Sequence, residues 1–161
     1  MPSITPNLWF DTQAEEAAEF YCSIFPNSRV LSITHYTEST QRAGQVVTVE
    51  WELDGQRFVG INGGPEFTPD EAVSLGIECE DQAEVDHYWT ALTADGGEES
   101  MCGWVKDKFG FSWQVTPKGI EELFRGPDPA ANDRAMKAMM TMRKLDIAAL
   151  RAAAAGEPAP A

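Results

Sequence analysis

One order of predicted elements occurs twice along this 161-residue chain, and no other feature limits its possible folds as strongly. The first half reads as a strand, a helix and three further strands, abbreviated βαβββ. The second half repeats that order, although only two strands can be counted after its helix. Gln13-Ala14-Glu15 and Gln82-Ala83-Glu84 occupy the same place in the two helices, and Phe20 matches Trp89 at the same offset. Such internal similarity is typical of one supersecondary unit used twice.

Alternating and β-branched runs predict the strands of the first half, at residues 4–10, 29–36, 45–53 and 56–62. Asp54-Gly55 marks a tight turn between the last two strands. Thr12 and Glu15 have the T-x-x-E spacing of a capping box, so the helix is expected to begin there and to end before Pro26.

The second half predicts strands at residues 72–80, 98–106 and 110–117. A capping signal, Asp81 with Glu84, begins its helix, which Asp95-Gly96-Gly97 ends. The polar connection 107–110 closes a β-hairpin between the last two strands. Strand side chains alternate between the two faces of a sheet, so the last run has one apolar and one polar face. The apolar face carries Phe111, Trp113 and Val115, and the polar face carries Ser112, Gln114 and Thr116.

Helix formers dominate after Pro117, and they predict a short helix at 119–124 and a long one from Ala130 to Ala155. The long helix carries a stripe for packing on a core or a second subunit, namely Met136, Met139, Met140, Met142, Leu145, Ile147 and Leu150. We therefore divide one compact domain into a first module (1–64), a second module (65–117), C-terminal helices (118–155) and a frayed tail (156–161).

The net charge of −14, from 26 acidic and 12 basic residues, excludes two classes of partner. A nucleic-acid backbone or an anionic membrane surface would be repelled, so neither is expected. No run approaches the roughly 20 apolar residues of a membrane span, and the N-terminus lacks a signal-peptide pattern. Cys22, Cys79 and Cys102 are odd in number and lack a C-x-x-C motif, so we expect free thiols and a cytoplasmic protein.

Several strings resemble the PhnB-like family, often labelled 3-demethylubiquinone-9 3-methyltransferase-like. This family belongs to the vicinal oxygen chelate superfamily of glyoxalase I, bleomycin-resistance proteins and extradiol dioxygenases. The resemblance covers roughly residues 3–150. It is carried by Phe10-Asp11-Thr12 with Ala17 and Phe20-Tyr21, by residues 58–65 (FVGINGGP), by 102–110 (CGWVKDKFG) with Ser112-Trp113-Gln114, and by the tail 139–150.

The resemblance implies an α+β fold in which the two βαβββ modules form a curled, half-open mixed sheet around a cavity, followed by C-terminal helices. It also implies a homodimer with sites in or near the dimer interface. In superfamily enzymes, side chains on the inner strand faces hold a divalent cation, which polarises vicinal oxygens of the substrate as a Lewis acid.

The ligand positions of that metal centre fit this chain badly. The first-strand ligand falls near Pro6 or Asn7, the ligand of the second module near Ser74, the last-strand glutamate at Gln114 and the fourth ligand near Asn62. Proline cannot coordinate, and neutral serine and amide oxygens are poor replacements for imidazole and carboxylate. We therefore expect neither a metal nor another cofactor.

A cavity framed by aromatic and neutral polar groups suits an organic ligand of modest size. The candidate ligand-binding residues, with Trp104 and Gln114 foremost, are Trp9, Asn62, Cys102, Trp104, Lys106, Ser112 and Gln114. No catalytic residue follows from the pattern. The leading hypothesis is a homodimer that binds a small organic molecule without a metal.

Three alternatives stay open. The first is a metal-dependent lyase, isomerase or dioxygenase with a relocated metal, held by His35 or by carboxylates such as Glu50 and Glu52. The second is an interaction module whose cavity is filled by its own aromatic side chains. The third, the methyltransferase of the family label, lacks a sequence basis, because the Gly-rich segment 60–65 does not open a helix as a Rossmann-type site requires.

Overall fold

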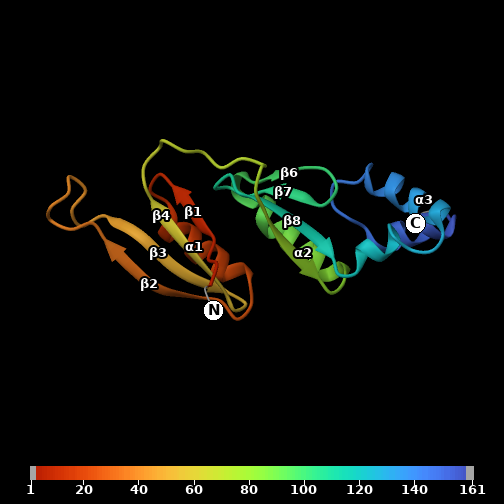
Figure 1. Cartoon of the computed structure of the whole chain (residues 1–161), viewed down its shortest axis with the longest axis horizontal. Coiled ribbons are helices and arrows are strands. Elements are labelled where there is room, and N and C mark those ends of the chain that lie inside the picture. The colour runs from red at the N-terminus through yellow and green to blue at the C-terminus, as the bar shows by residue number, and fades with distance from the viewer. Residues whose placement is uncertain (1–2, 159–161) are drawn as a thin grey trace. The chain divides into compact units, whose positions relative to one another are not determined.

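The computed structural model describes residues 3–158 (Figure 1). The chain divides between Pro69 and Asp70 into two compact units, each with a four-stranded sheet of its own. Within the described residues, none of the helices has the length and apolar character that a bilayer span requires.

The first unit is a βαβββ module. Its strand order is β1-β4-β3-β2, with β1 parallel to β4 and the other neighbours antiparallel. The alternating runs predict all four strands, and the structure confirms them with shorter ends. The elements are β1 (Asn7–Phe10), α1 (Ala14–Ile24), β2 (Arg29–His35), β3 (Val46–Leu53) and β4 (Gln56–Asn62).

The second unit repeats this topology. Its strand order is β5-β8-β7-β6, and its first strand is again parallel to its last. The predicted βαβββ repetition and the α+β class are therefore confirmed. The elements are β5 (Ser74–Cys79), α2 (Gln82–Thr93), a 3-10 turn (Ala94–Gly96), β6 (Glu98–Glu99), β7 (Trp104–Lys106) and β8 (Ser112–Pro117).

The sequence predicts a single strand at residues 98–106. The structure has two strands there, β6 and β7, and the additional strand completes the βαβββ order of the second unit. Glu98 pairs with Lys106 across a hairpin between β6 and β7. The turn between them contains Cys102 at φ 58° and Gly103 at φ 84°. A positive φ turns the backbone out of the extended conformation, so a single strand cannot continue through these residues.

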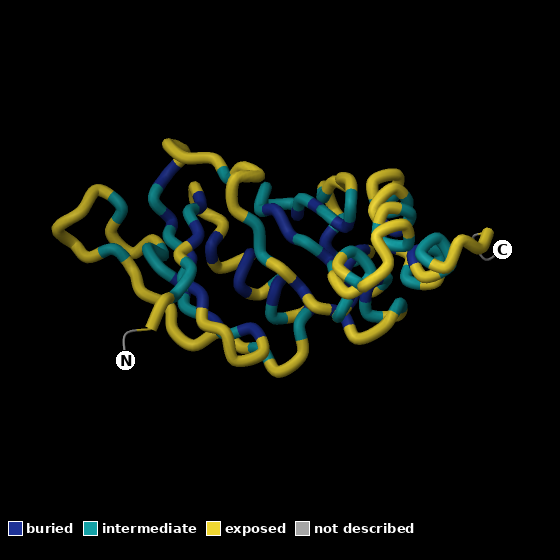
Figure 2. The backbone as a smooth tube through the Cα atoms, turned by 45° about the vertical axis from the view of Figure 1, so that its right-hand side comes forward, coloured by how far each residue is buried: buried dark blue, intermediate teal, exposed yellow. Residues whose placement is uncertain are grey.

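The helix of the first unit covers one face of its sheet, where Val49, Trp51 and Leu53 of β3 are buried (Figure 2). Val49 and Trp51 have no exposed surface, and Tyr21 of α1 stacks on the Trp51 ring. Gly60 of β4 makes this close packing possible. A Cβ at this position would lie 2.9 Å from both the Ala14 Cβ and the Trp51 ring.

The second unit is built in the same way around α2. Its strands bury Val105, Trp113 and Val115, and α2 buries Val85 and Leu92. Trp113 and Val115 are thus on the apolar face, as the alternation predicts, whereas Gln114 and Thr116 on the other face are half-buried.

The two core helices begin differently from one another. Asp81 caps α2 as predicted, accepting the Glu84 N–H at 3.0 Å. The capping box predicted for α1 is wrong, because its N-cap residue is Gln13 and makes no side-chain capping bond. Instead, Asn62 Oδ1 accepts the Ala14 N–H at 2.9 Å.

The long C-terminal helix predicted at 130–155 is also wrong, because the structure has two helices, α3 (Pro129–Met139) and α4 (Ile147–Ala155), preceded by a 3-10 turn (Ile120–Leu123). Asp146 begins the second helix by accepting the Ala149 N–H at 2.8 Å. Between the helices, the carbonyls of Met142 and Arg143 accept the N–H groups of Cys102 and Gly103. Ile120, Leu145 and Leu150 form the buried cluster between these segments.

Gly156, at φ 78°, ends α4 and begins the predicted tail, whose residues 159–161 lie outside the described part of the chain.

Candidate ligand-binding site

Each sheet has a second face, opposite its helix, which we call the open face. In the second unit, the pairing of β7 with β8 sets Trp104 across from Gln114, and Lys106 across from Ser112. Paired residues point to the same side of a sheet, so these four predicted residues form one continuous patch. The predicted hairpin is confirmed, and it is the element that brings them together.

A neutral hydrogen bond occupies the next part of this face. The Gln114 amide donates from Nε2 to the Ser74 hydroxyl over 2.8 Å. Gly76 lies directly across from Gln114 on β5, and a Cβ built there would meet no atom within 4 Å. The Gln114 amide therefore has open space on the β5 side, over Gly76, and Trp104 as its neighbour on the β7 side.

A pocket of about 100 Å³ adjoins the patch at Lys106 and Ser112. Lys106 Nζ pairs with Glu71 Oε1 at 2.5 Å. This hydrogen bond holds the pKa of Glu71 below its ordinary value and raises the pKa of Lys106, so both groups are charged near neutral pH. Ser112 is only 3% exposed, and its hydroxyl has no hydrogen-bond partner within residues 3–158. The remaining lining residues are Glu98, Glu99, Ser100 and Val105.

Asp107 fixes the hairpin that carries these residues, and the sequence indicated it only as part of the polar connection 107–110. It is only 2% exposed. Its Oδ1 accepts the N–H groups of Phe109 and Phe111, and its Oδ2 accepts Trp113 Nε1–H at 2.8 Å. An Asp at the start of a tight connection that bonds the backbone two residues on is the sequence signal that could have found it.

Cys102 belongs to the turn before β7 instead of the strand itself. Its Sγ lies 3.8 Å from the Met140 sulfur, and its N–H donates to the Met142 carbonyl. The turn therefore joins the hairpin to the connection between α3 and α4.

Trp9 and Asn62 belong to the first unit. Trp9 lies on the open face of its sheet, where Nε1–H donates to the Gly64 carbonyl at 2.8 Å and the ring meets Phe67 edge-on at 4.9 Å. Asn62 lies on the helix-covered face and uses both amide atoms, since Oδ1 accepts from Ala14 and Nδ2 donates to the Val46 carbonyl.

The donor set does not fit the metal centre of the superfamily. At the expected ligand positions of the second unit, Ser74 and Gln114 offer neutral oxygens and bind each other. The open face of β4 in the first unit carries Val59 and Ile61, which cannot coordinate a metal. Within residues 3–158, no three His, Cys, Asp or Glu side chains are grouped so that they could hold an ion.

The residues considered for a relocated metal have other surroundings. Glu50 pairs with Arg57, and Glu52 pairs with Arg29 at 3.3 Å. His35 is exposed on β2. The other histidine of the chain, His87 on α2, was not a candidate and packs edge-on against Tyr88, with 4.9 Å between ring centroids.

Comparisons with known proteins agree with this fold. The family model of 3-demethylubiquinone-9 3-methyltransferase matches residues 2–116. A putative 3-demethylubiquinone-9 3-methyltransferase, PhnB protein, from Bacillus cereus is 35% identical, with 72% of this chain and 99% of that chain covered and a TM-score of 0.63. None of the curated proteins compared with the chain is significantly similar to it.

Two more distant solved structures share the fold alone. A protein from Pseudomonas aeruginosa is 17% identical, with 73% of this chain and 98% of that chain covered and a TM-score of 0.62. The fosfomycin resistance protein FosX from Listeria monocytogenes is 15% identical, with 75% and 94% covered and a TM-score of 0.52. The chain belongs to the PhnB-like, or 3-demethylubiquinone-9 3-methyltransferase, family.

Proposed function

We propose that this protein binds a small organic molecule on the open face of its second sheet, beside Trp104 and Gln114, and that it does so without a metal ion. The observation that carries the proposal is the cross-strand register, which sets Trp104 against Gln114 while Gly76 leaves room on the other side of the amide. An aromatic wall next to a directed polar group is the usual composition of a small-molecule site.

The hydrogen bonding of Gln114 indicates how it would act. Its Nε2 is oriented by the Ser74 hydroxyl, and its Oε1 accepts no hydrogen bond within the described residues. The amide therefore presents a fixed acceptor to a ligand donor, while the Trp104 indole covers an apolar or aromatic part of the molecule.

The neutral donors Ser74 and Gln114 support the metal-free version of the proposal, because a transition metal prefers imidazole and carboxylate ligands. Elemental analysis of untagged protein purified without chelator tests it. Well below one metal ion per chain is expected. Near-stoichiometric zinc, manganese, iron or nickel would instead favour the lyase, isomerase or dioxygenase alternative.

The methyltransferase activity in the family's name is not part of the proposal. A Rossmann-type site for S-adenosylmethionine uses a parallel sheet with a glycine-rich turn into a helix. Each sheet here has a single parallel pair, β1 with β4 and β5 with β8, and Gly64 leads into a loop.

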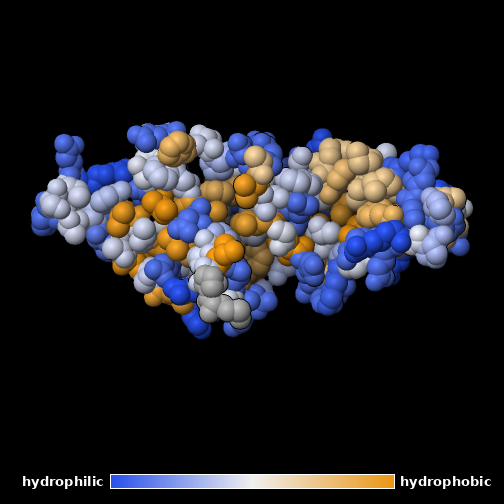
Figure 3. Space-filling view, in the orientation of Figure 1, coloured by the Kyte–Doolittle hydropathy of each residue, from blue (hydrophilic) through white to orange (hydrophobic). Residues whose placement is uncertain are grey.

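A homodimer and a cytoplasmic location complete the proposal. The edge strand β2 is exposed along its whole length and carries apolar side chains at Val30, Leu31 and Ile33. Figure 3 shows apolar side chains among polar ones over the strands of this unit. Exposed apolar edge strands are suited to association with a second copy of the chain, and sedimentation equilibrium tests the homodimer.

The free thiols of Cys22, Cys79 and Cys102 suit a reducing compartment, which supports the cytoplasmic location.

Ligand-detected NMR with a panel of aromatic compounds and antibiotics tests the binding role directly. At least one compound is expected to give saturation transfer with the wild-type protein and to lose it with Trp104→Ala. The matched control is Ile4→Ala, which truncates an almost fully exposed apolar side chain before β1 and is expected to leave the signal unchanged. A panel that never contacts the protein would contradict the proposal.

A further inference from the structure

The pocket beside Lys106 has more negative than positive charge, and this imbalance bears on ligand chemistry. Glu71 and Glu98 bring two carboxylates to the Lys106 side, against the single ammonium group of Lys106, whereas Glu99 pairs with Val105 and turns its carboxylate to Trp89 of α2. An anionic ligand group would meet net repulsion there, whereas a cationic group would be attracted.

The partners of these carboxylates show where the uncompensated charge lies. Lys106 Nζ pairs with Glu71, and Glu99 accepts Trp89 Nε1–H at 2.9 Å and lies 3.7 Å from an Arg143 nitrogen. Glu98 is directly across from Lys106 in the β6–β7 register and its charge helps to raise the pKa of Lys106 after the larger effect of Glu71, but no ion pair or hydrogen bond of its side chain occurs within residues 3–158. The carboxylate of Glu98 is therefore the group that a ligand cation would neutralise.

Ser112 supplies an independent sign that a polar group belongs in this pocket. Its hydroxyl is buried and unpartnered, although a buried hydroxyl without a hydrogen bond destabilises the fold. Lys106 is its cross-strand neighbour, so a change of the Lys106 rotamer on binding can bring the Ser112 oxygen into contact with a ligand. That oxygen can accept a hydrogen bond from an N–H donor.

We infer that the pocket receives the ammonium group of the ligand, with Glu98 as its charge partner and the Ser112 oxygen as a hydrogen-bond acceptor. The bound molecules are then primary amines with an aromatic body that lies against Trp104, two residues away from Lys106 on the same face of β7. The inference rests on the ligand site proposed above, and it adds the chemical class of the ligand.

Three probes with the same ring and different head groups separate the amine from the rest of the site. Isothermal titration at pH 7 compares 2-phenylethylamine, 2-phenylethanol and 3-phenylpropionate. We expect the amine to bind at least about tenfold more tightly than the carboxylate. Glu98→Gln and Ser112→Ala are each expected to weaken amine binding about threefold or more, and Glu98→Gln is expected to leave the alcohol unchanged.

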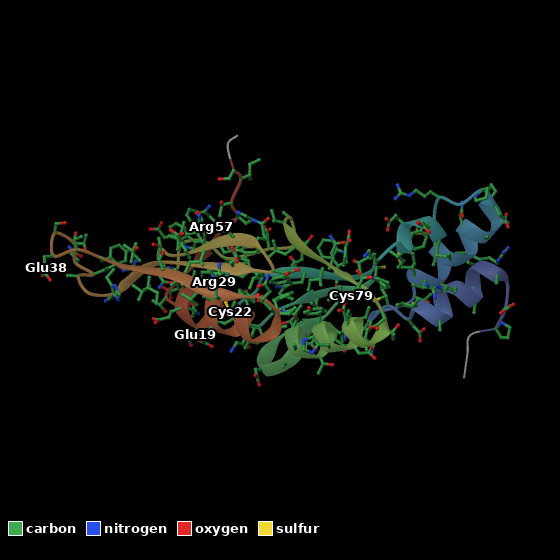
Figure 4. All side chains as sticks on the ribbon, turned by 90° about the horizontal axis from the view of Figure 1, so that it is seen from below. Glu19, Cys22, Arg29, Glu38, Arg57 and Cys79 are labelled. Atoms are coloured by element: carbon green, nitrogen blue, oxygen red, sulfur yellow. The ribbon has the colours of Figure 1, made fainter. Side chains whose placement is uncertain are left out.

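The control is Glu38→Gln, which removes the same charge from the exposed loop between β2 and β3 (Figure 4). It should not change amine binding, and an effect as large as that of Glu98→Gln would overturn the inference by showing a general attraction of cations. If all three probes bind equally and Trp104→Ala abolishes each, the ligand site stands and the amine inference is wrong. If none binds at millimolar concentration, the amine inference is wrong, and the wider panel of aromatic compounds and antibiotics decides the proposed function separately.

Discussion

Asn62 Oδ1 accepts the backbone N–H of Ala14 at 2.9 Å, so the last strand of the first unit caps a helix that begins 48 residues earlier. The other end of the same amide, Nδ2, donates to the Val46 carbonyl at 3.1 Å. One buried side chain thus ties β4 to α1 and to β3. This explains why the helix needs no capping side chain from its own sequence.

Replacing Asn62 by alanine should therefore destabilise the protein. The variant leaves the Ala14 N–H and the Val46 carbonyl without their partner, which is expected to lower the free energy of unfolding by about 1–3 kcal/mol in urea titrations. Asn7→Ala is the control, because the Asn7 amide bonds the Thr5 carbonyl on the exposed surface. Unchanged stability of Asn62→Ala together with weaker ligand binding would instead assign Asn62 to the ligand site.

Asp107 should matter both for stability and for the binding patch. Asp107→Asn keeps the size of the side chain but loses the charge and at least one of its three accepted hydrogen bonds, so about 1.5–3 kcal/mol of unfolding free energy is expected to be lost. Asp95→Asn removes the same charge from an exposed turn and is expected to stay within about 0.5 kcal/mol. Equal stability of the two variants in denaturant titrations would refute the buried role of Asp107.

Two glycines make a matched test of the open face. Gly76→Ala should leave the thermal midpoint unchanged or raise it, since a Cβ there meets no atom within 4 Å and glycine is unfavourable in a strand. Gly60→Ala should cost about 1–3 kcal/mol, because its Cβ would lie 2.9 Å from Ala14 and Trp51. A third variant, Gly76→Leu, places a larger side chain in the space beside Gln114.

The Gly76→Leu variant should fold normally and lose most of the ligand affinity, as measured by titration with whichever compound the wild-type protein binds. Full affinity in a folded Gly76→Leu variant would place the ligand elsewhere on the protein.

Sequence reasoning succeeded where the determinant is local. Alternation along 111–116 predicted the buried positions of Trp113 and Val115, and the repeated order of elements predicted the shared topology of the two sheets. It failed where the determinant is a contact between distant residues. Nothing in the sequence around Ala14 points to Asn62, and the positive φ of Cys102 inside an alternating run is set by bonds to the segment after α3.

The binding patch follows the same division. Trp104, Lys106, Ser112 and Gln114 could be predicted to share a face, because one hairpin sets their register. The space over Gly76 and the missing partner of the Ser112 hydroxyl depend on neighbours that come from β5 and from the wider packing, so alternation alone cannot predict them.

Cys79 should make the stability of the protein fall at alkaline pH. Burial, with smaller contributions from the carboxylates of Glu84 and Asp81, raises the pKa of this thiol to about 12 (Figure 4). In the unfolded chain the thiol ionises near pH 9, so between about pH 9 and 12 only the unfolded state loses this proton. Ionisation then favours unfolding, and the contribution of the thiol to stability is complete below pH 9 and declines above it.

Urea titrations of wild-type protein and Cys79→Ala at pH 8 and pH 10 measure this effect. The wild-type protein is expected to lose more unfolding free energy over this interval than Cys79→Ala, whose residue 79 has no proton to lose. Ile77→Val is the control, because it removes a buried methylene from the same strand and face without changing a titratable group, and it should keep the wild-type pH dependence. Parallel losses in all three proteins would mean that the Cys79 thiol ionises as easily in the fold as in the unfolded chain.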